Sequence, residues 1–178
     1  MRKLIPGSLI TPTMADELRM RIEADLLAEA AAKGFRDMVV TDLLPFTDLN
    51  IGAGSGGIAN QDYWHSAALT ANTALIYANH ALDENEFVAI YGVAIDDANP
   101  STRKVKLQRG AASILADWNL QEIYCDTMPI GYCEEYVKWL GTDVVYVELL
   151  PEVTKTAGDK LVLIGLTCIP RGTKRLTK

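Results

Sequence analysis

The pattern of apolar and polar positions changes once along the chain, from a helical period to a strand-like one. In the N-terminal segment, Leu18, Ile22 and Leu26 recur every four residues, and charged residues, among them Arg19, Arg21, Glu23 and Asp25, stand between them. This spacing is typical of an amphipathic helix, and Leu27 and Ala30 widen its apolar stripe. The segment therefore predicts one helix of about five turns, whose stripe packs on the body of its own chain or on a neighbouring subunit.

The ends of this segment carry residues that helix termini prefer. Thr13 is a good N-cap, with Asp16 three positions later, and acidic residues early in a helix favour its dipole. Gly34 follows Lys33 and is a natural C-cap. We therefore expect the helix to span residues 13–33.

The rest of the chain alternates short apolar runs with turn residues. The runs are rich in Val, Ile, Tyr, Trp and Thr, which strands prefer, and Gly, Pro, Asp and Asn separate them. Seven or eight strands at this spacing, with no clear helices between them, predict a mainly β fold, an antiparallel β-sandwich or jelly roll. The predicted strands are 38–44, 73–82, 86–95, 103–109, 113–125, 136–140, 143–150 and 160–169. One predicted turn runs from Thr127 to Gly131.

Two of these strands are apolar on both faces. They are VVYVELL, residues 144–150, and LVLIGL, residues 161–166. A strand of this kind is covered on both sides, either by its own chain or, on one face, by a neighbouring subunit.

Length and composition indicate one globular domain. The chain has 178 residues, of which 49% are hydrophobic and 22% are charged, an ordinary profile for a folded protein with a sizeable core. We expect three parts: an N-terminal arm and helix at 1–34, a β-sandwich at 35–170 and a basic tail at 171–178.

Charge is unevenly distributed along the chain. The tail carries Arg171, Lys174, Arg175 and Lys178 and no acid, so the net charge of −6 leaves −10 on the other residues. An acidic body does not suit general nucleic-acid binding, which depends on neutralising phosphates. The tail itself could contact nucleic acid, an acidic lipid surface or the acidic face of a neighbour, or be a solvated terminus.

The cysteines and the apolar runs exclude several classes. Cys125, Cys133 and Cys168 are odd in number and none has C-x-x-C spacing, so we expect neither a disulfide framework nor a zinc site. Pro6 and Gly7 break the only stretch that resembles a signal peptide. No apolar run approaches the roughly 18 residues of a membrane helix, so we expect no transmembrane segment. We expect a protein that is kept in a reducing compartment, the cytoplasm, or that leaves the cell without a secretory signal.

The glycine-rich stretch GAGSGG at 52–57 is the most conspicuous motif. It matches G-x-G-x-x-G, but a dinucleotide site needs a strand before it and a capped helix after it, and neither is predicted here. A Walker loop needs lysine where Ile58 stands. Ser55 nearly matches a nucleophile elbow, but the required strand–turn–helix context is again missing. We interpret the stretch as a flexible or closely packed joint.

Other chemistry is sparse. His65 and His80 are the only histidines, and a metal site of the cupin kind would need both of them together with a carboxylate. Nothing selects a catalytic pair among the acidic residues. The tryptophans and tyrosines could line a sugar-binding face, but we expect them mainly in the core. We therefore predict no cofactor, no bound metal and no enzymatic activity.

The stretch from Phe87 to Gly172 resembles small β-sandwich proteins of icosahedral virus and phage heads. The resemblance lies in the order of FVAIYGVAIDDANP, LADWNLQEIY, PIGYCEE, GTDVVYVELL and DKLVLIGLTCIPRG. It implies a structural, self-assembling subunit of a virion, as a capsid, minor capsid or decoration protein, without catalysis. Its partners would be other copies of itself and neighbouring shell proteins, and it would be located in the virion rather than in the cytoplasm.

Such subunits contact their neighbours through terminal arms. Here the arms would be residues 1–12, the helix and the basic tail. The interface candidates are Leu18, Ile22, Leu26, Arg171, Lys174 and Arg175. Two alternatives stay open: a ligand-binding sandwich of the lectin or cupin kind, and a hydrolase that uses Ser55 or distant carboxylates.

Overall fold

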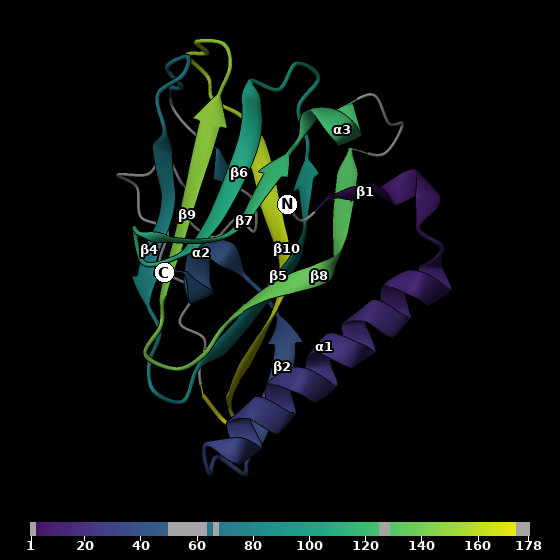
Figure 1. Cartoon of the computed structure of the whole chain (residues 1–178), viewed down its shortest axis with the longest axis vertical. Coiled ribbons are helices and arrows are strands. Elements are labelled where there is room, and N and C mark those ends of the chain that lie inside the picture. The colour runs from purple at the N-terminus through teal and green to yellow at the C-terminus, as the bar shows by residue number, and fades with distance from the viewer. Residues whose placement is uncertain (1–2, 50–63, 66–67, 125–128, 174–178) are drawn as a thin grey trace.

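Two antiparallel sheets stacked face to face, with one long helix across the outside of the larger sheet, form the body of the protein (Figure 1). The computed structural model describes residues 3–49, 64–65, 68–124 and 129–173. The stretch 52–57, with Ser55, lies outside the described residues. The prediction of a mainly β sandwich with an N-terminal helix is confirmed.

The two sheets are built from ten strands in the described part of the chain. The larger sheet has the order β1 (Ile5–Pro6), β8 (Ile130–Trp139), β5 (Phe87–Ile95), β10 (Lys160–Pro170) and β2 (Met38–Asp42), and β3 (Trp64–His65) also pairs with β10. The smaller sheet has the order β4 (Leu75–Ala81), β9 (Val144–Pro151), β6 (Thr102–Arg109) and β7 (Ser113–Asn119). The helical elements are η1 (Gly7–Leu9), α1 (Pro12–Ala32), α2 (Pro45–Asp48) and α3 (Gln121–Tyr124).

The strand pairing is that of a jelly roll. Strand β2 pairs with β10, β4 with β9, β5 with β8, and β6 with β7, so that each pair encloses the next one along the chain. The pairs β5–β10 and β6–β9 then join these hairpins into two sheets. This nesting is the eight-strand, double-sheet arrangement of jelly rolls. Of the two predicted architectures, the topology therefore selects the jelly roll.

The main core lies between the sheets. Trp118, Trp139 and Tyr77 have no exposed surface and fill the space between the inner faces. The indole Nε1 of Trp139 on β8 donates to the backbone oxygen of Gln108 on β6 at 2.8 Å, which links the two sheets. The expectation that aromatic residues plug the core is confirmed for Trp118 and Trp139.

The helix α1 begins one residue earlier than predicted. Thr11, and not Thr13, is the N-cap, and its Oγ1 accepts from the backbone N–H of Met14 at 3.2 Å. Pro12 takes the first helical position, where its fixed φ fits and its missing N–H costs nothing. The proline thus moves the cap to the residue before it.

The helix α1 ends at Ala32, one residue before the predicted end, and Gly34 terminates it as predicted. Gly34 has φ +91°, the left-handed region that glycine enters without strain. The N–H groups of Gly34 and Phe35 donate to the backbone oxygens of Ala31 and Ala30, each at 3.0 Å. These two bonds form a Schellman motif and close the helix.

A second core lies between α1 and the larger sheet. Ile22, Leu26 and Ala30 are fully buried there against β5 and β10. The apolar outer face of β10 is therefore covered by the protein's own helix. We call Ile22, Leu26 and Ala30, with the half-buried Leu18, the inner stripe. Of the two partners considered for it, the structure selects the body of its own chain.

Two local predictions were wrong. The predicted strand 113–125 ends at Asn119, since the Asn119 side chain accepts from the N–H of Gln121 at 3.2 Å and turns the chain into α3. Gly131 lies inside β8 and not in a turn. A Cβ at Gly131 would lie 3.0 Å from Ile123 and 3.2 Å from Leu4, so a close contact, and not a turn, requires glycine there.

Candidate functional site

The predicted interface residues fall into three groups. Ile22 and Leu26 are buried within the chain, and Leu18 is half-buried beside them. Arg171 is exposed, and its Nε lies 2.9 Å from Oδ1 of Asp37. Lys174 and Arg175 lie outside the described residues. In the described chain, the inner stripe therefore holds the protein together and leaves other surfaces to face partners.

Polar contacts hold α1 firmly on the sheet. Lys138 Nζ on β8 lies 2.8 Å from Asp25 and 2.7 Å from Glu29, and the Tyr136 hydroxyl donates to Asp25 at 2.7 Å. Burial alone raises the pKa of Asp25, but hydrogen bonds from Lys138 and Tyr136 outweigh it and lower that pKa. Arg21 also donates to the backbone oxygen of Glu134 at 2.6 Å. The helix is thus a fixed part of the body.

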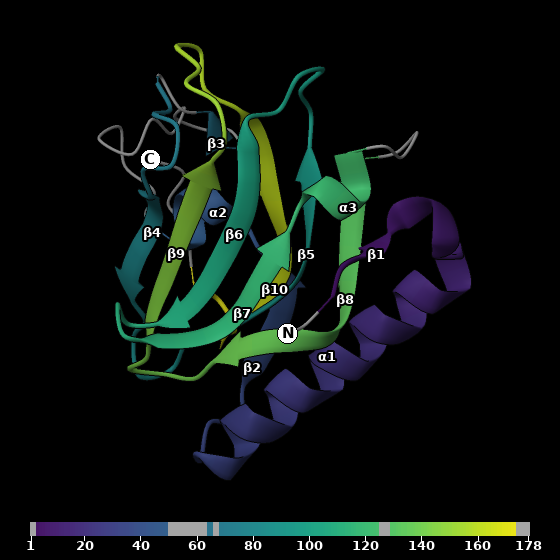
Figure 2. The same ribbon diagram turned by 45° about the horizontal axis from the view of Figure 1, so that its top comes forward.

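The opposite side of α1 carries a second apolar stripe, which we call the outer stripe. It consists of Met20, Ala24, Leu27 and Ala31, all of them exposed. In Figures 1 and 2 the outer side of α1 faces away from both sheets. The assignment of Leu27 to the inner stripe was therefore wrong. At 100° per residue, Leu27 lies far from Ile22 and shares its face with Met20, seven positions earlier.

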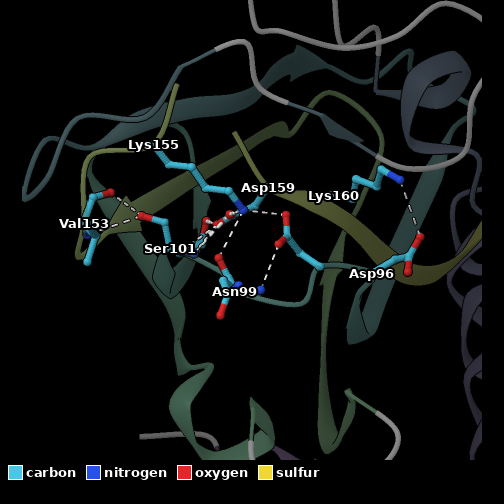
Figure 3. A network of polar contacts seen from close by, with 9 residues as sticks. Asp96, Asn99, Ser101, Val153, Lys155, Asp159 and Lys160 are labelled. Atoms are coloured by element: carbon cyan, nitrogen blue, oxygen red, sulfur yellow. Dashed lines mark hydrogen bonds and ion pairs between the residues drawn. The ribbon is translucent and has the colours of Figure 1, made fainter. Parts of the chain in front are cut away.

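The loop end of the jelly roll holds a buried carboxylate. Asp159, just before β10, has no exposed surface. It accepts from the N–H of Ser101 at 2.9 Å, from the N–H of Thr102 at 2.6 Å, and from the Thr102 hydroxyl at 2.7 Å. Lys155 Nζ adds a fourth donor at 3.0 Å. Figure 3 shows Ser101 from the β5–β6 loop converging with Lys155 and Asp159 from the β9–β10 loop.

Lys155 bridges the same two loops. Besides Asp159, its Nζ contacts Asp97 at 2.6 Å and the backbone oxygen of Asn99 at 3.1 Å. Burial alone lowers the pKa of Lys155, but hydrogen bonds to Asp97 and Asp159 outweigh it and raise that pKa above its ordinary value. A lysine that stays charged is a poor nucleophile or base. Lys155 contacts oxygen atoms of both loops, so we conclude that the cluster holds the β5–β6 and β9–β10 loops together.

A cavity of about 510 Å³ opens beside this cluster. Its lining includes Asn99, Val153, Lys155 and Tyr124. The Tyr124 hydroxyl is buried without a hydrogen-bond partner among the described residues, and burial raises its pKa. An aromatic ring beside an amide side chain is the kind of lining that binds a polar organic ligand. Sequence reasoning missed this cavity, because its residues come from two separate loops and from α3.

The histidines considered for a metal site lie on different sheets. His65 belongs to β3 in the larger sheet and His80 to β4 in the smaller one. Within the described ranges, no three His, Cys, Asp or Glu residues gather in a group that could hold a metal ion. No helix in the same ranges has the length and apolar character needed to cross a membrane.

By its fold, the described chain is a jelly roll with one helix packed on the outer face of the larger sheet. The sequence matches no model of a known protein family and has no significant similarity to a curated protein.

Proposed function

We propose that the protein is a structural subunit that assembles with copies of itself into a virus-like shell, as a capsid, minor capsid or decoration protein. The nested jelly-roll pairing of the eight strands carries this proposal. Jelly rolls occur in viral capsid domains, in lectins and in cupins. Because a fold alone does not define a function, the exposed surfaces have to discriminate between these classes.

Exposed apolar side chains support the assembly reading. Ile76 lies on β4 and Ile114 on β7, the two edge strands of the smaller sheet. They are 45% and 59% exposed. Apolar residues on opposite edges suit a head-to-tail contact between copies, which closes into rings when the rotation permits. The basic tail would contact a neighbour's acidic body or packaged nucleic acid.

Assembly can be tested on the purified full-length chain. Size-exclusion chromatography with light scattering, followed by negative-stain electron microscopy, should show discrete oligomers or particles that grow with protein concentration. Ile114→Glu should shift this equilibrium towards the monomer. Ser113→Glu, next to it on the same strand, is the matched control for the added charge. A monomer at every concentration and ionic strength would contradict self-assembly.

A lectin-like binding protein is the second candidate, and the cavity beside Tyr124 favours it. Sugar-binding sites combine an aromatic face with amide, hydroxyl and charged groups. A glycan screen by calorimetry tests this candidate. If the cavity binds a sugar against the Tyr124 ring, Tyr124→Leu should weaken binding about tenfold by the loss of the aromatic face. Circular dichroism checks that the variant keeps its fold.

A further inference from the structure

In the described part of the chain, no other segment covers the outer stripe of α1. We propose that it docks against the outer stripe of a second copy, with the two helices antiparallel across a two-fold axis. The inference rests on the proposed function of self-assembly and names the partner of this one surface.

The exposure of the outer stripe argues for a partner. Met20 is 62% exposed and Leu27 37%, whereas Ile22, on the other side of the same helix, has no exposed surface. One apolar face is enough to hold a surface helix on its sheet. A second apolar face on the solvent side, without a charged residue at any of its four positions, is typical of an interaction surface.

The spacing of the stripe is that of a coiled-coil seam. Met20, Ala24, Leu27 and Ala31 follow one another at intervals of four, three and four residues. As heptad positions, Met20 and Leu27 fall at d, and Ala24 and Ala31 fall at a. The seam thus places large side chains at d and small ones at a.

This alternation in size favours an antiparallel pair of identical helices. In an antiparallel pair each a position faces a d position of the partner. Leu27 then meets Ala24 of the second copy, and Met20 meets Ala31 of the second copy. In a parallel pair, alanine would face alanine and leucine would face leucine, which packs unevenly. Two-fold symmetry with the same patch on both subunits is the commonest form of self-association.

The charges beside the seam are compatible with this arrangement. Arg21 and Glu23 flank the stripe on its two sides. In the antiparallel register, Arg21 comes next to Ala28 of the second copy, and the residue opposite Glu23 is Ala30, whose side chain is buried against its own sheet and carries no charge. No like charges therefore face each other across the seam.

The small size of the stripe sets the expected strength. Four side chains on one helix cover much less than the roughly 800 Å² per partner of a standard stable interface. We therefore expect a weak pair in dilute solution. In a shell, many such contacts act together, and each gains from the high local concentration that the others impose.

Cysteine cross-linking tests the register. In a background in which Cys125 is replaced by serine, M20C together with A31C should form a disulfide-linked dimer under mild oxidation. Residues 20 and 31 are about 16 Å apart along one helix, so they cannot pair within a chain. Either single variant should give far less dimer, since antiparallel helices keep identical positions apart. Strong cross-linking of M20C alone would overturn the antiparallel arrangement.

A second experiment separates this contact from the proposed function. M20E combined with L27E should raise the dissociation constant of the pair at least about tenfold. M14E is the matched control, because Met14 is exposed on another side of the same helix, where glutamate completes a capping box with Thr11. Circular dichroism checks that each variant keeps its helix.

The outcomes are distinct. Particles that form equally well with M20E/L27E, with no cross-linking of M20C/A31C, would overturn the helix contact and leave the shell proposal standing. Cross-linked dimers without any larger particle would support the helix contact and overturn the shell. A strict monomer with no cross-linking would overturn both.

Discussion

Lys155 and Asp159 form an ion pair at the loop end of the jelly roll, with 3.0 Å between Nζ and Oδ1. The Asp159 side chain is fully buried, and it also accepts from the backbone of Ser101 and Thr102. One carboxylate therefore binds the loop between β9 and β10 to the loop between β5 and β6. Because a buried charge is costly unless its partners satisfy it, this residue is decisive for the shape of the loop end.

Removal of this carboxylate should destabilise the protein strongly. Asp159→Ala leaves two buried N–H groups and a hydroxyl without their acceptor and removes one of the two carboxylates that Lys155 contacts. We expect a loss of about 3 kcal/mol or more in the free energy of unfolding. Asp159→Asn should lose less, because one amide oxygen still accepts. Urea denaturation measures both.

The control for this prediction is Asp96→Asn. Asp96 is exposed and lies 3.9 Å from Lys160, so the change should cost less than about 0.5 kcal/mol. Equal losses for Asp159→Ala and Asp96→Asn would show that the network does not stabilise the loops.

The same cluster should make the free energy of unfolding depend on pH in the acidic range. Burial alone raises the pKa of Asp97, but hydrogen bonds from Lys155 and the N–H of Asn99 outweigh it, so the folded pKa lies below the ordinary 3.8. A carboxyl with a lowered folded pKa contributes stability above its unfolded pKa and loses it as the pH falls through the folded value. Asp97→Asn should therefore be less stable than the wild type at neutral pH.

Measurements at low pH test whether the ionisation of Asp97 stabilises the folded protein. The stability curves of wild type and Asp97→Asn should converge as the pH is lowered from about 5 to about 2, measured by denaturation at each pH. Curves that stay parallel over this range would mean that Asp97 does not titrate with a lowered pKa in the folded protein.

The strands were largely predictable, because each is a local run of residues that prefer strand geometry. The run ending at Ile169 was predicted at 160–169 and is observed as Lys160–Pro170. The pairing of β2 with β10 was not predictable, since it joins opposite ends of the chain and depends on the packing of the whole sandwich. Gln121–Tyr124 was missed because its helix depends on one Asn119 side-chain bond.

The candidate surfaces were predictable only in part. The four-residue period identified Ile22 and Leu26 as a buried stripe, because a helix on a sheet needs such a stripe. The same period concealed the outer stripe, since Leu27 follows Leu26 directly and was grouped with it. The Asp159 network could not be foreseen, because its donors become neighbours only when two distant loops meet.

Placing a charge in the inner stripe should unfold the protein or weaken it severely. Ile22 has no exposed surface and lies in the cluster with Phe87 and Leu166. Ile22→Asp buries a carboxylate among apolar groups and should cost more than about 3 kcal/mol. Met20→Asp adds the same charge to the outer side of the helix and should cost less than about 1 kcal/mol. Thermal denaturation compares them, and an unchanged melting temperature for Ile22→Asp would rule out docking of α1 on the sheet.

The close approach of Gly141 to the backbone of Glu84 predicts a loss of stability on substitution. A Cβ there would lie 2.0 Å from the backbone oxygen of Glu84, an approach that only glycine allows. Because backbone cannot swing aside as a side chain can, Gly141→Ala should cost about 3 kcal/mol. Gly110→Ala is the control: Gly110 has φ +61° but open space around it, so strain alone should cost about 1 kcal/mol. Urea denaturation of both variants separates crowding from backbone strain. If Gly141→Ala lowers the free energy of unfolding no more than Gly110→Ala does, the β4–β5 loop with Glu84 and the β8–β9 loop with Gly141 can separate at little cost.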